Sequence, residues 1–159
     1  MRVKVLSHEN FNQLMYANKI NDDTVEDVKD SIFISIVGTH ADKDHWFTTD
    51  HPNVLNLEFD DRDFSDRDKN LDCSLPGNKF FDDDMAGRII KMLENNKDTA
   101  KNAYIHCAYG VSRSGAVGEV INNYYSDDKY EVFKRNNPQV IPNAYVKSVL
   151  SRAYYNYED

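Results

Sequence analysis

One stretch, from Ala103 to Gly118, constrains the fold of this chain more than any other: AYIHCAYGVSRSGAVG. It begins with an apolar run typical of a buried strand and ends in small residues typical of a helix start. The loop between them, which we call the anion loop (residues 107–113), begins at Cys107 and ends at Arg113. A strand, a tight loop and a helix N-terminus in this order turn backbone N–H groups inward and can hold an anion.

Each polar residue of this loop has a chemical role that suits such a site. Cys107 is a nucleophile once it is ionised, and N–H donors at a helix start favour its thiolate. Arg113 carries a permanent charge on a planar fork that can grip two oxygens of a phosphate. Gly110 allows a sharp bend, Ser114 can donate its hydroxyl to the sulfur, and His106 can fix the loop by bonding to backbone.

The segment from His106 to Ser114 resembles the HCxxGxxRS signature of the cysteine-dependent protein tyrosine phosphatase superfamily, and it is most similar to the dual-specificity branch. The resemblance implies an α/β fold with a central, mostly parallel sheet of four to five strands flanked by helices. It implies that Cys107, Arg113 and Ser114 are catalytic and that a phosphocysteine intermediate forms without any cofactor or metal. It also implies a set of substrate-binding residues, namely His106, Ala108, Tyr109, Gly110, Val111, Ser112 and Arg113.

A second segment extends the resemblance toward the C-terminus. Residues Arg135 to Asn143 resemble the R-x-x-P-x-I-x-P-N segment of the same family, which leads into a last helix. The similar part therefore runs from about Val54 to Leu150, and we expect the whole chain, residues 1–159, to form a single phosphatase domain.

Breaking a phosphate ester also requires a positioned acid that protonates the departing oxygen. In the family this acid is an aspartate on the loop after the strand that precedes the signature strand, and the resemblance assigns the role to Asp61. The separation between Asp61 and Cys107 is 46 residues, longer than in typical members, which predicts an insertion around residues 63–78. Asp60, Asp63 and Asp72 remain alternate general acids, with Asp72 favoured by spacing alone, and the acidic run is also compatible with a solvated loop.

Two metal hypotheses are weaker. A calcium loop counted from Asp61 would need glycine at its sixth position and glutamate at its twelfth, and the chain has aspartate at both. The loop between residues 38 and 52 holds His40, His45 and His51, but no cysteine pair accompanies them, so we interpret them as ordinary loop histidines. The sequence therefore predicts no metal site.

The same cysteine loop leaves other functions open. One alternative is a catalytically weak module that recognises phosphorylated partners, and another is a phosphatase of a non-protein phosphate ester. Sulfur transferases and arsenate reductases use related loops, but arsenate reduction needs a resolving cysteine. Only Cys73 could serve in that way, or pair with Cys107 in a protective disulfide. A cysteine that merely fills the core leaves Gly110 and Arg113 unexplained.

Net charge and cysteine content restrict the partners and the compartment. A formal net charge of −8 argues against nucleic acid or an anionic membrane as a partner. Two cysteines are too few for a disulfide framework, so we expect a reducing, cytoplasmic setting. We expect a monomer that acts on a phosphorylated protein or peptide. The loop positions around Cys107 carry no lysine, which disfavours phosphoinositides, while Tyr109 could form a wall for a phosphotyrosine ring.

Hydrophobic patterning predicts the remaining elements. Strands are expected at Val3–Leu6, Ser31–Val37, Val54–Phe59 and from Ala103. Helices are expected at about His8–Asn18, Phe80–Asn95, Gly115–Tyr125, Asp127–Asn136 and Ala144–Tyr155. The anion loop should then lie at the carboxyl end of the central strand, where open α/β sheets bind ligands.

Overall fold

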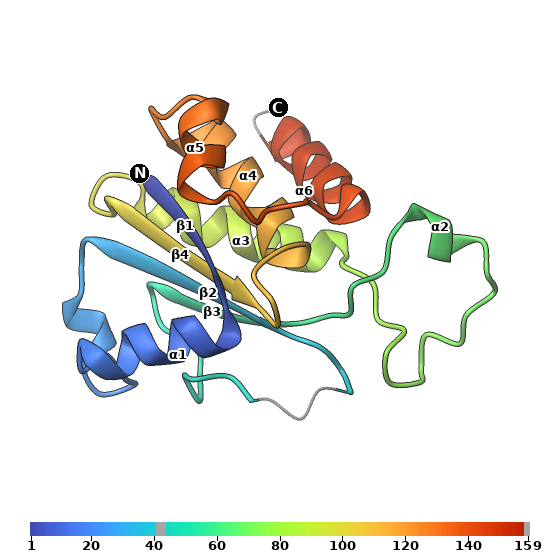
Figure 1. Cartoon of the computed structure of the whole chain (residues 1–159), viewed down its shortest axis with the longest axis horizontal. Helices are drawn as coiled ribbons and strands as arrows, with labels where there is room; N and C mark the ends of the chain where they lie inside the picture. Colours follow the sequence, from blue (N-terminus) through green and yellow to red (C-terminus); the bar gives the residue numbers. More distant parts are fainter. Residues whose placement is uncertain (41–43, 158–159) are drawn as a thin grey trace.

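The structure is a computed structural model that describes residues 1–40 and 44–157, so part of the predicted 38–52 loop and the last two residues of the predicted domain lie outside the described residues. Four strands form one parallel sheet in the order β1-β4-β2-β3 (Figure 1). They are β1 (Arg2–Ser7), β2 (Ser31–Val37), β3 (Val54–Glu58) and β4 (Asn102–Cys107). The predicted α/β class and parallel sheet are confirmed.

Helices cover both faces of the sheet (Figure 1). The structure has α1 (His8–Ala17), α2 (Phe64–Arg67), α3 (Asp83–Asn96), α4 (Arg113–Tyr125), α5 (Tyr130–Asn136) and α6 (Ala144–Tyr157). Helix α1 lies on one face with a short 3-10 turn, Val25–Asp27, while α3, α4 and α6 cover the other face. Within the described residues, no helix is long and apolar enough to cross a membrane.

Alternation along β2 and β4 divides the core into two clusters. Successive strand side chains point to opposite faces, so Ile34 and Ile105 belong to the larger cluster beneath α3, α4 and α6. Phe33 belongs to the smaller cluster against α1, together with the half-buried Tyr104. The two faces of the sheet differ in polarity. The face toward α1 also carries two buried polar side chains, Ser35 from β2 and His106 from β4.

Helix starts explain most differences from the predicted boundaries. Helix α3 begins at Asp83, not at Phe80, because Asp82 has an extended backbone and its carboxylate accepts the N–H of Met85. Helix α4 begins two residues earlier than expected, at Arg113, so the last residue of the anion loop is already helical. Helix α5 begins at Tyr130, later than the predicted Asp127.

The predicted insertion forms a protruding arm that carries α2 (Figure 1). Its two ends are joined, because Asp60 N–H donates to the Lys79 carbonyl at 2.7 Å and Lys79 N–H donates to the Asp60 carboxylate at 2.8 Å. Arg62 adds bonds to the Gly77 carbonyl and to Asn78. The chain therefore leaves and re-enters the body at almost the same point, which is why the extra residues leave the sheet undisturbed.

The outer edge of β1 is covered by side chains from the segment after α5. The amide of Asn137 accepts from Val5 N–H at 2.8 Å and donates to the Val3 carbonyl at 3.1 Å, as a neighbouring strand would. Gln139 donates both to the Val5 carbonyl and to the Gly110 carbonyl, each at 3.1 Å. Asn137 and Gln139 therefore take the place of a neighbouring strand beside β1. Gln139 also links this edge strand to the anion loop.

Candidate active site

The anion loop follows β4 directly and is pressed against the end of β1. Gly110 has a φ of +70°, and a Cβ at this position would lie 2.5 Å from the backbone carbon of Leu6 and 2.6 Å from Ser7 N. Only glycine fits such a close approach in this backbone conformation. The N–H of His8 also donates to the Ala108 carbonyl at 3.2 Å, so the β1–α1 junction forms one wall of the loop.

The loop carbonyls are tied to groups outside the loop. Gly110 O accepts from Gln139, Val111 O accepts from Ile141 N–H at 3.1 Å, and Ser112 O accepts from Asn143 N–H at 3.0 Å. Ala108 O is held by His8, and Cys107 O by the ring of His106 at 3.3 Å. Since N–H and C=O of one peptide point in opposite directions, these bonds turn the following N–H groups toward the inside of the loop.

Cys107 is buried, at 3% exposure, and its sulfur lies 3.0 Å from the Ser114 hydroxyl oxygen. Burial alone would raise the pKa of this thiol. The Ser114 hydroxyl, the backbone N–H of Ser114, the Arg113 charge and the N–H of Val111 outweigh burial, and together they lower the pKa below its ordinary value. The surroundings of the sulfur therefore favour a thiolate.

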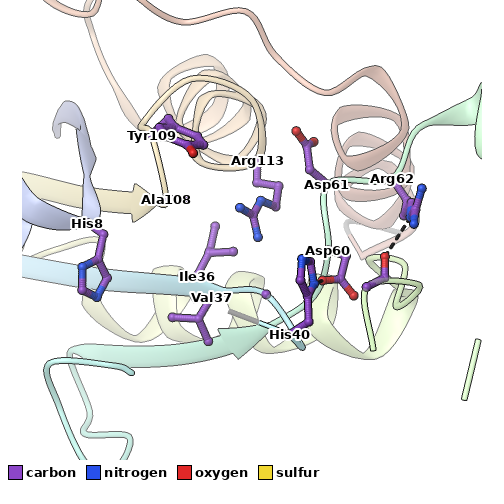
Figure 2. Close-up of a pocket in the computed structure, with 12 residues that line it drawn as sticks. His8, Ile36, Val37, His40, Asp60, Asp61, Arg62, Ala108, Tyr109 and Arg113 are labelled. Carbon is purple, nitrogen blue, oxygen red and sulfur yellow. Dashed lines mark hydrogen bonds and ion pairs between the residues drawn. The ribbon is translucent and has the colours of Figure 1, made fainter. Parts of the chain in front are cut away.

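Arg113 lies in the first turn of α4, and its side chain extends into the space between Tyr109 and Asp60 (Figure 2). One terminal nitrogen donates to the Phe59 carbonyl at 3.0 Å, which ties the arginine to the loop after β3. Its Nε is buried and has no hydrogen-bond partner among the described residues. A buried N–H of a charged group costs free energy unless it is paired, and the described protein groups supply no acceptor for this one.

A cavity of about 340 Å³ lies beside Arg113 and the first residues after Cys107, while the buried Cys107 itself is not among its lining residues. It is lined by His8, Ile36, Val37, Gly38, His40, Asp60, Asp61, Arg62, Gly77, Ala108, Tyr109 and Arg113 (Figure 2). These residues come from the carboxyl ends of β2, β3 and β4, from the start of α1 and from the arm. Tyr109 is 83% exposed, so an aromatic ring stands at the rim of the cavity.

Asp61 lies on the acid loop (residues 59–63), and one of its two carboxylate oxygens is held by two donors. The Ser112 hydroxyl donates to Asp61 Oδ1 at 2.9 Å, and the Asn143 amide donates to the same oxygen at 2.8 Å. Asn143 also donates to the Arg62 carbonyl at 3.0 Å. The acid loop is thus latched onto the anion loop, and Asp61 Oδ2 has no hydrogen bond to the described residues.

The alternate aspartates lie in different surroundings. Asp60 is buried and accepts from Thr39 N–H, the Thr39 hydroxyl and Lys79 N–H. Burial would raise the pKa of Asp60, but these donors and nearby His40 lower it, so the group is held as a carboxylate. Asp72 is exposed on the arm and does not line the cavity, and its bonds to Ser74 lower its pKa.

His106 is buried behind the loop and is neutral. Burial lowers its pKa to about 3 despite the bond to the Cys107 carbonyl, and the nearby charge of Arg113 acts in the same direction as burial. On its other side, His106 Nε2 lies 2.6 Å from the Ser35 hydroxyl. The ring therefore bridges the centre of the sheet and the first peptide of the anion loop.

Sequence reasoning missed the residues that support the site. Gln139 and Asn143 lay in the quoted C-terminal segment, but their contacts with the anion loop depend on how that segment folds back. Ser35 carried a usable signal, because it is the only polar residue inside the apolar run from Ile32 to Val37. A buried hydroxyl in such a run needs a partner.

The loop histidines and the second cysteine are used in other ways. His45 contacts Ser35, His51 contacts Asp22 and Glu26, and His40 lies 3.5 Å from Asp60. In residues 1–40 and 44–157, no cluster of three or more His, Cys, Asp or Glu side chains could hold a metal ion. Cys73 is exposed and Cys107 is buried, and neither forms a disulfide.

The fold resembles that of a known phosphatase. No protein-family model matches the chain, and no curated protein matches it in sequence. A crystal structure of Tk-PTP, a protein tyrosine phosphatase, in the active form superposes with a TM-score of 0.51 at 14% sequence identity. The match covers 98% of this chain and 92% of that chain. The chain therefore has a protein tyrosine phosphatase-like α/β fold, with a parallel four-stranded sheet flanked by helices.

Proposed function

We propose that this protein is a protein phosphatase, of the tyrosine or dual-specificity type, that hydrolyses phosphomonoesters through a phosphocysteine intermediate. One observation carries the proposal: the Cys107 sulfur, 3.0 Å from the Ser114 hydroxyl oxygen, belongs to the loop whose Arg113 lines a cavity together with Asp61. A nucleophile, a cation for the phosphate and an acid are the three groups that this reaction needs.

In the first step the Cys107 thiolate attacks phosphorus and a P–S bond forms. The ester P–O bond breaks, its electron pair leaves with the oxygen, and Asp61 supplies the proton that makes the leaving group an alcohol or phenol. The loop N–H groups and the Arg113 guanidinium balance the charge on the transferring phosphoryl group, which is where most of the acceleration in phosphoryl transfer arises. The Nε of Arg113, for which no described residue provides an acceptor, supports this role.

In the second step a water molecule attacks the phosphocysteine. Asp61, now a carboxylate, takes a proton from this water as the oxygen bonds to phosphorus. The P–S bond breaks, inorganic phosphate leaves and the thiolate returns. The Ser114 hydroxyl, at hydrogen-bond distance from the sulfur, stabilises the departing thiolate in this step.

The surroundings of the cavity favour a ligand with a single phosphate. Arg62 is committed to the Gly77 carbonyl and to Asn78, so it serves to hold the arm. Among the described residues that line the cavity, Arg113 is then the arginine whose Nε is buried without a hydrogen-bond partner. The exposed ring of Tyr109 at the rim supports a phosphorylated aromatic side chain as substrate.

The deciding experiment compares hydrolysis of an aryl phosphate and of phosphotyrosine, phosphoserine and phosphothreonine peptides by matched variants. We expect Cys107→Ser to abolish turnover while still binding phosphate or vanadate. Cys73→Ser is the control and should keep wild-type activity, because that thiol is exposed on the arm. Substantial turnover by Cys107→Ser would refute the nucleophile, and vanadate binding by a wild-type protein without turnover would indicate a recognition module.

Three aspartate-to-asparagine variants identify the acid. Asp61→Asn should lower kcat about 10²–10⁴-fold for esters with basic leaving groups, and much less for leaving groups that need no proton. Asp60→Asn should mainly reduce stability, because its amide would face donors that require an acceptor. Asp72→Asn should behave like the wild type. A larger kcat loss in Asp60→Asn than in Asp61→Asn would move the acid to Asp60.

A further inference from the structure

A serine and two histidines form a connected chain behind the anion loop. The Ser35 hydroxyl oxygen lies 2.6 Å from His106 Nε2 and 2.6 Å from His45 Nδ1. Ser35 and His106 are buried at 0% exposure, while His45 is half-buried on the loop after β2. His106 continues the chain to the Cys107 carbonyl, which its Nδ1 approaches to 3.3 Å. None of the steps proposed above uses Ser35 or His45.

The sheet explains why these groups meet. Ser35 on β2 is in register with His106 on β4, so the two side chains lie beside each other on the same face. That face is the α1 face, because the neighbouring residues Ile34 and Ile105 belong to the cluster on the opposite side. The rings of Phe11 and His8 contact His106 at centroid distances of 4.4 and 5.3 Å and enclose it. The sheet and α1 thus fix the His106 ring in place.

Counting hydrogens gives the direction of each bond. A carbonyl oxygen can only accept, so His106 Nδ1 must carry a proton to bond with the Cys107 carbonyl. The ring is neutral, because burial lowers its pKa to about 3, and Nε2 is therefore an acceptor. The hydroxyl hydrogen of Ser35 goes to Nε2, which leaves the Ser35 oxygen to accept from the Nδ1–H of His45.

We propose that Ser35 and His45 are positioning residues for the anion loop: His45 orients the Ser35 hydroxyl, which holds His106 in the tautomer that donates from Nδ1 to the Cys107 carbonyl. This bond fixes the peptide that joins Cys107 to Ala108. The carbonyls of Val111 and Ser112 are held by backbone N–H groups, which cannot change tautomer. The Cys107 carbonyl is instead held by the His106 ring, which can change tautomer. The hydrogen bond from Ser35 to Nε2 keeps this ring in one tautomer.

The consequence concerns anion binding. With the Cys107 carbonyl held outward, the N–H of Ala108 points toward the inside of the loop, where the proposed function places the phosphate. The choice of phosphate as the anion rests on the proposed function. The tautomer of His106 does not depend on that function. Loss of the Ser35 hydroxyl leaves both ring nitrogens able to carry the proton, and the loop then spends part of its time without this bond.

Two matched pairs of variants test the proposal. Ser35→Ala removes the hydroxyl and Ser35→Thr keeps it. His45→Leu removes the donor at the half-exposed end, where a change disturbs the core least, and His45→Asn keeps an N–H at the same distance along the side chain. We expect phosphate affinity to fall about tenfold in Ser35→Ala and His45→Leu, the effect of one hydrogen bond, and to be largely restored in Ser35→Thr and His45→Asn.

The direct measurement is ¹⁵N NMR of the His106 imidazole in the folded protein, which reports which nitrogen carries the proton. We expect the proton on Nδ1 in the wild type between pH 5 and 8, and a mixture of tautomers in Ser35→Ala and His45→Leu. A proton on Nε2 in the wild type would overturn the proposal, as would unchanged His106 spectra and phosphate affinity in both variants. A protein with the expected spectra and no phosphatase activity would instead refute the proposed function alone.

Discussion

The side-chain amide of Asn143 lies 2.8 Å from the carboxylate of Asp61, although 82 positions separate the two residues in the chain. The backbone N–H of Asn143 also donates to the Ser112 carbonyl, and the Ser112 hydroxyl donates to Asp61. Three segments therefore meet at one point: the acid loop, the anion loop and the start of α6. The proposed acid is held by the loop that would hold its substrate.

Asn143→Ala should lower kcat about tenfold for esters with basic leaving groups, because Asp61 loses one of its two donors and its fixed orientation. Asn143→Asp should lower kcat at least as much, because its carboxylate cannot donate to Asp61, although it keeps an oxygen to accept the Val146 N–H at the helix start. Steady-state rates with a series of phenyl phosphates measure both effects. Equal losses for good and poor leaving groups would show that Asn143 acts on the loop as a whole and not through the acid.

The lowered pKa of Cys107 predicts alkylation of this thiol at pH values where an ordinary cysteine is protonated. In a Cys73→Ser background, the pH midpoint of iodoacetamide labelling should lie below that of a free cysteine. Ser114→Ala should move the midpoint upward, because burial raises the pKa of Cys107 and the variant lacks the hydroxyl that helps to lower it. Ser112→Ala is the matched control and should leave the midpoint in place, since its hydroxyl bonds to Asp61. A midpoint that does not move in Ser114→Ala would contradict the assigned role of that hydroxyl.

Gly110→Ala should reduce both stability and phosphate affinity. The added Cβ would lie 2.5 Å from the Leu6 backbone at a φ of +70°, so either the loop or the end of β1 must shift. A loss of roughly 1–3 kcal/mol in the free energy of unfolding is expected. Gly87→Ala on α3 has open space around its Cβ and should stabilise the protein by up to about 1 kcal/mol. Chemical denaturation checks both, and a wild-type free energy of unfolding and phosphate affinity in Gly110→Ala would show that the close approach is not required.

His51 should make stability depend on pH in a defined window. Burial would lower its pKa, but the bonds to Asp22 and Glu26 raise it above the value of an ordinary histidine. Burial would raise the pKa of Asp22, but His51 and Thr48 lower it. The ion pairs of His51 with Asp22 and Glu26 are therefore fully formed between about pH 4 and 6.5. Their stabilisation is lost as the pH rises through the His51 pKa in the folded protein. It is also lost in acid, as Asp22 becomes protonated.

The variant His51→Gln, which removes the imidazole ring, tests the contribution of these ion pairs. The variant should lose about 1 kcal/mol relative to the wild type at pH 5.5, a value appropriate for pairs that are partly in solvent. The difference should shrink at pH 8.5, where the wild-type ring is neutral. Urea denaturation at the two pH values gives the comparison. A larger deficit at pH 8.5 than at pH 5.5 would contradict the direction of the His51 shift.

Several features were predictable from the sequence because they depend on local chemistry. The run SIFISIV could only be a buried strand, and Ser31–Val37 is the observed extent of β2. The helix expected from His8 does begin there, because Ser7, a residue type favoured at helix N-caps, accepts the N–H of Asn10 at 3.1 Å. Strand β4, the anion loop and the start of α4 follow one another in the predicted order, since each is set by residues next to it in the chain.

Boundaries and the arm were less predictable because they depend on contacts between distant residues. Helix α2 in the arm was not predicted, since its start depends on mutual capping between Asp63 and Asp66 within a highly charged segment. Asp63 also accepts the N–H of Tyr145 at the start of α6, which no local pattern indicates. The length of the arm obscured how close Asp61 comes to the anion loop, because the pairing of Asp60 with Lys79 brings the chain back.

The sequence by itself determined that an anion loop begins at a cysteine and ends at an arginine, because strand, turn and helix propensities act over a few residues. Only the tertiary structure decided which aspartate faces that loop, how its carbonyls are held outward and which hydroxyl reaches His106. Those relationships join β1, β2, the acid loop and the segment before α6, and they form only when the sheet brings the carboxyl ends of its strands together. Hydrogen bonds have a range of about 3 Å, so residues far apart in the chain take on their roles only after the fold has brought them within that distance.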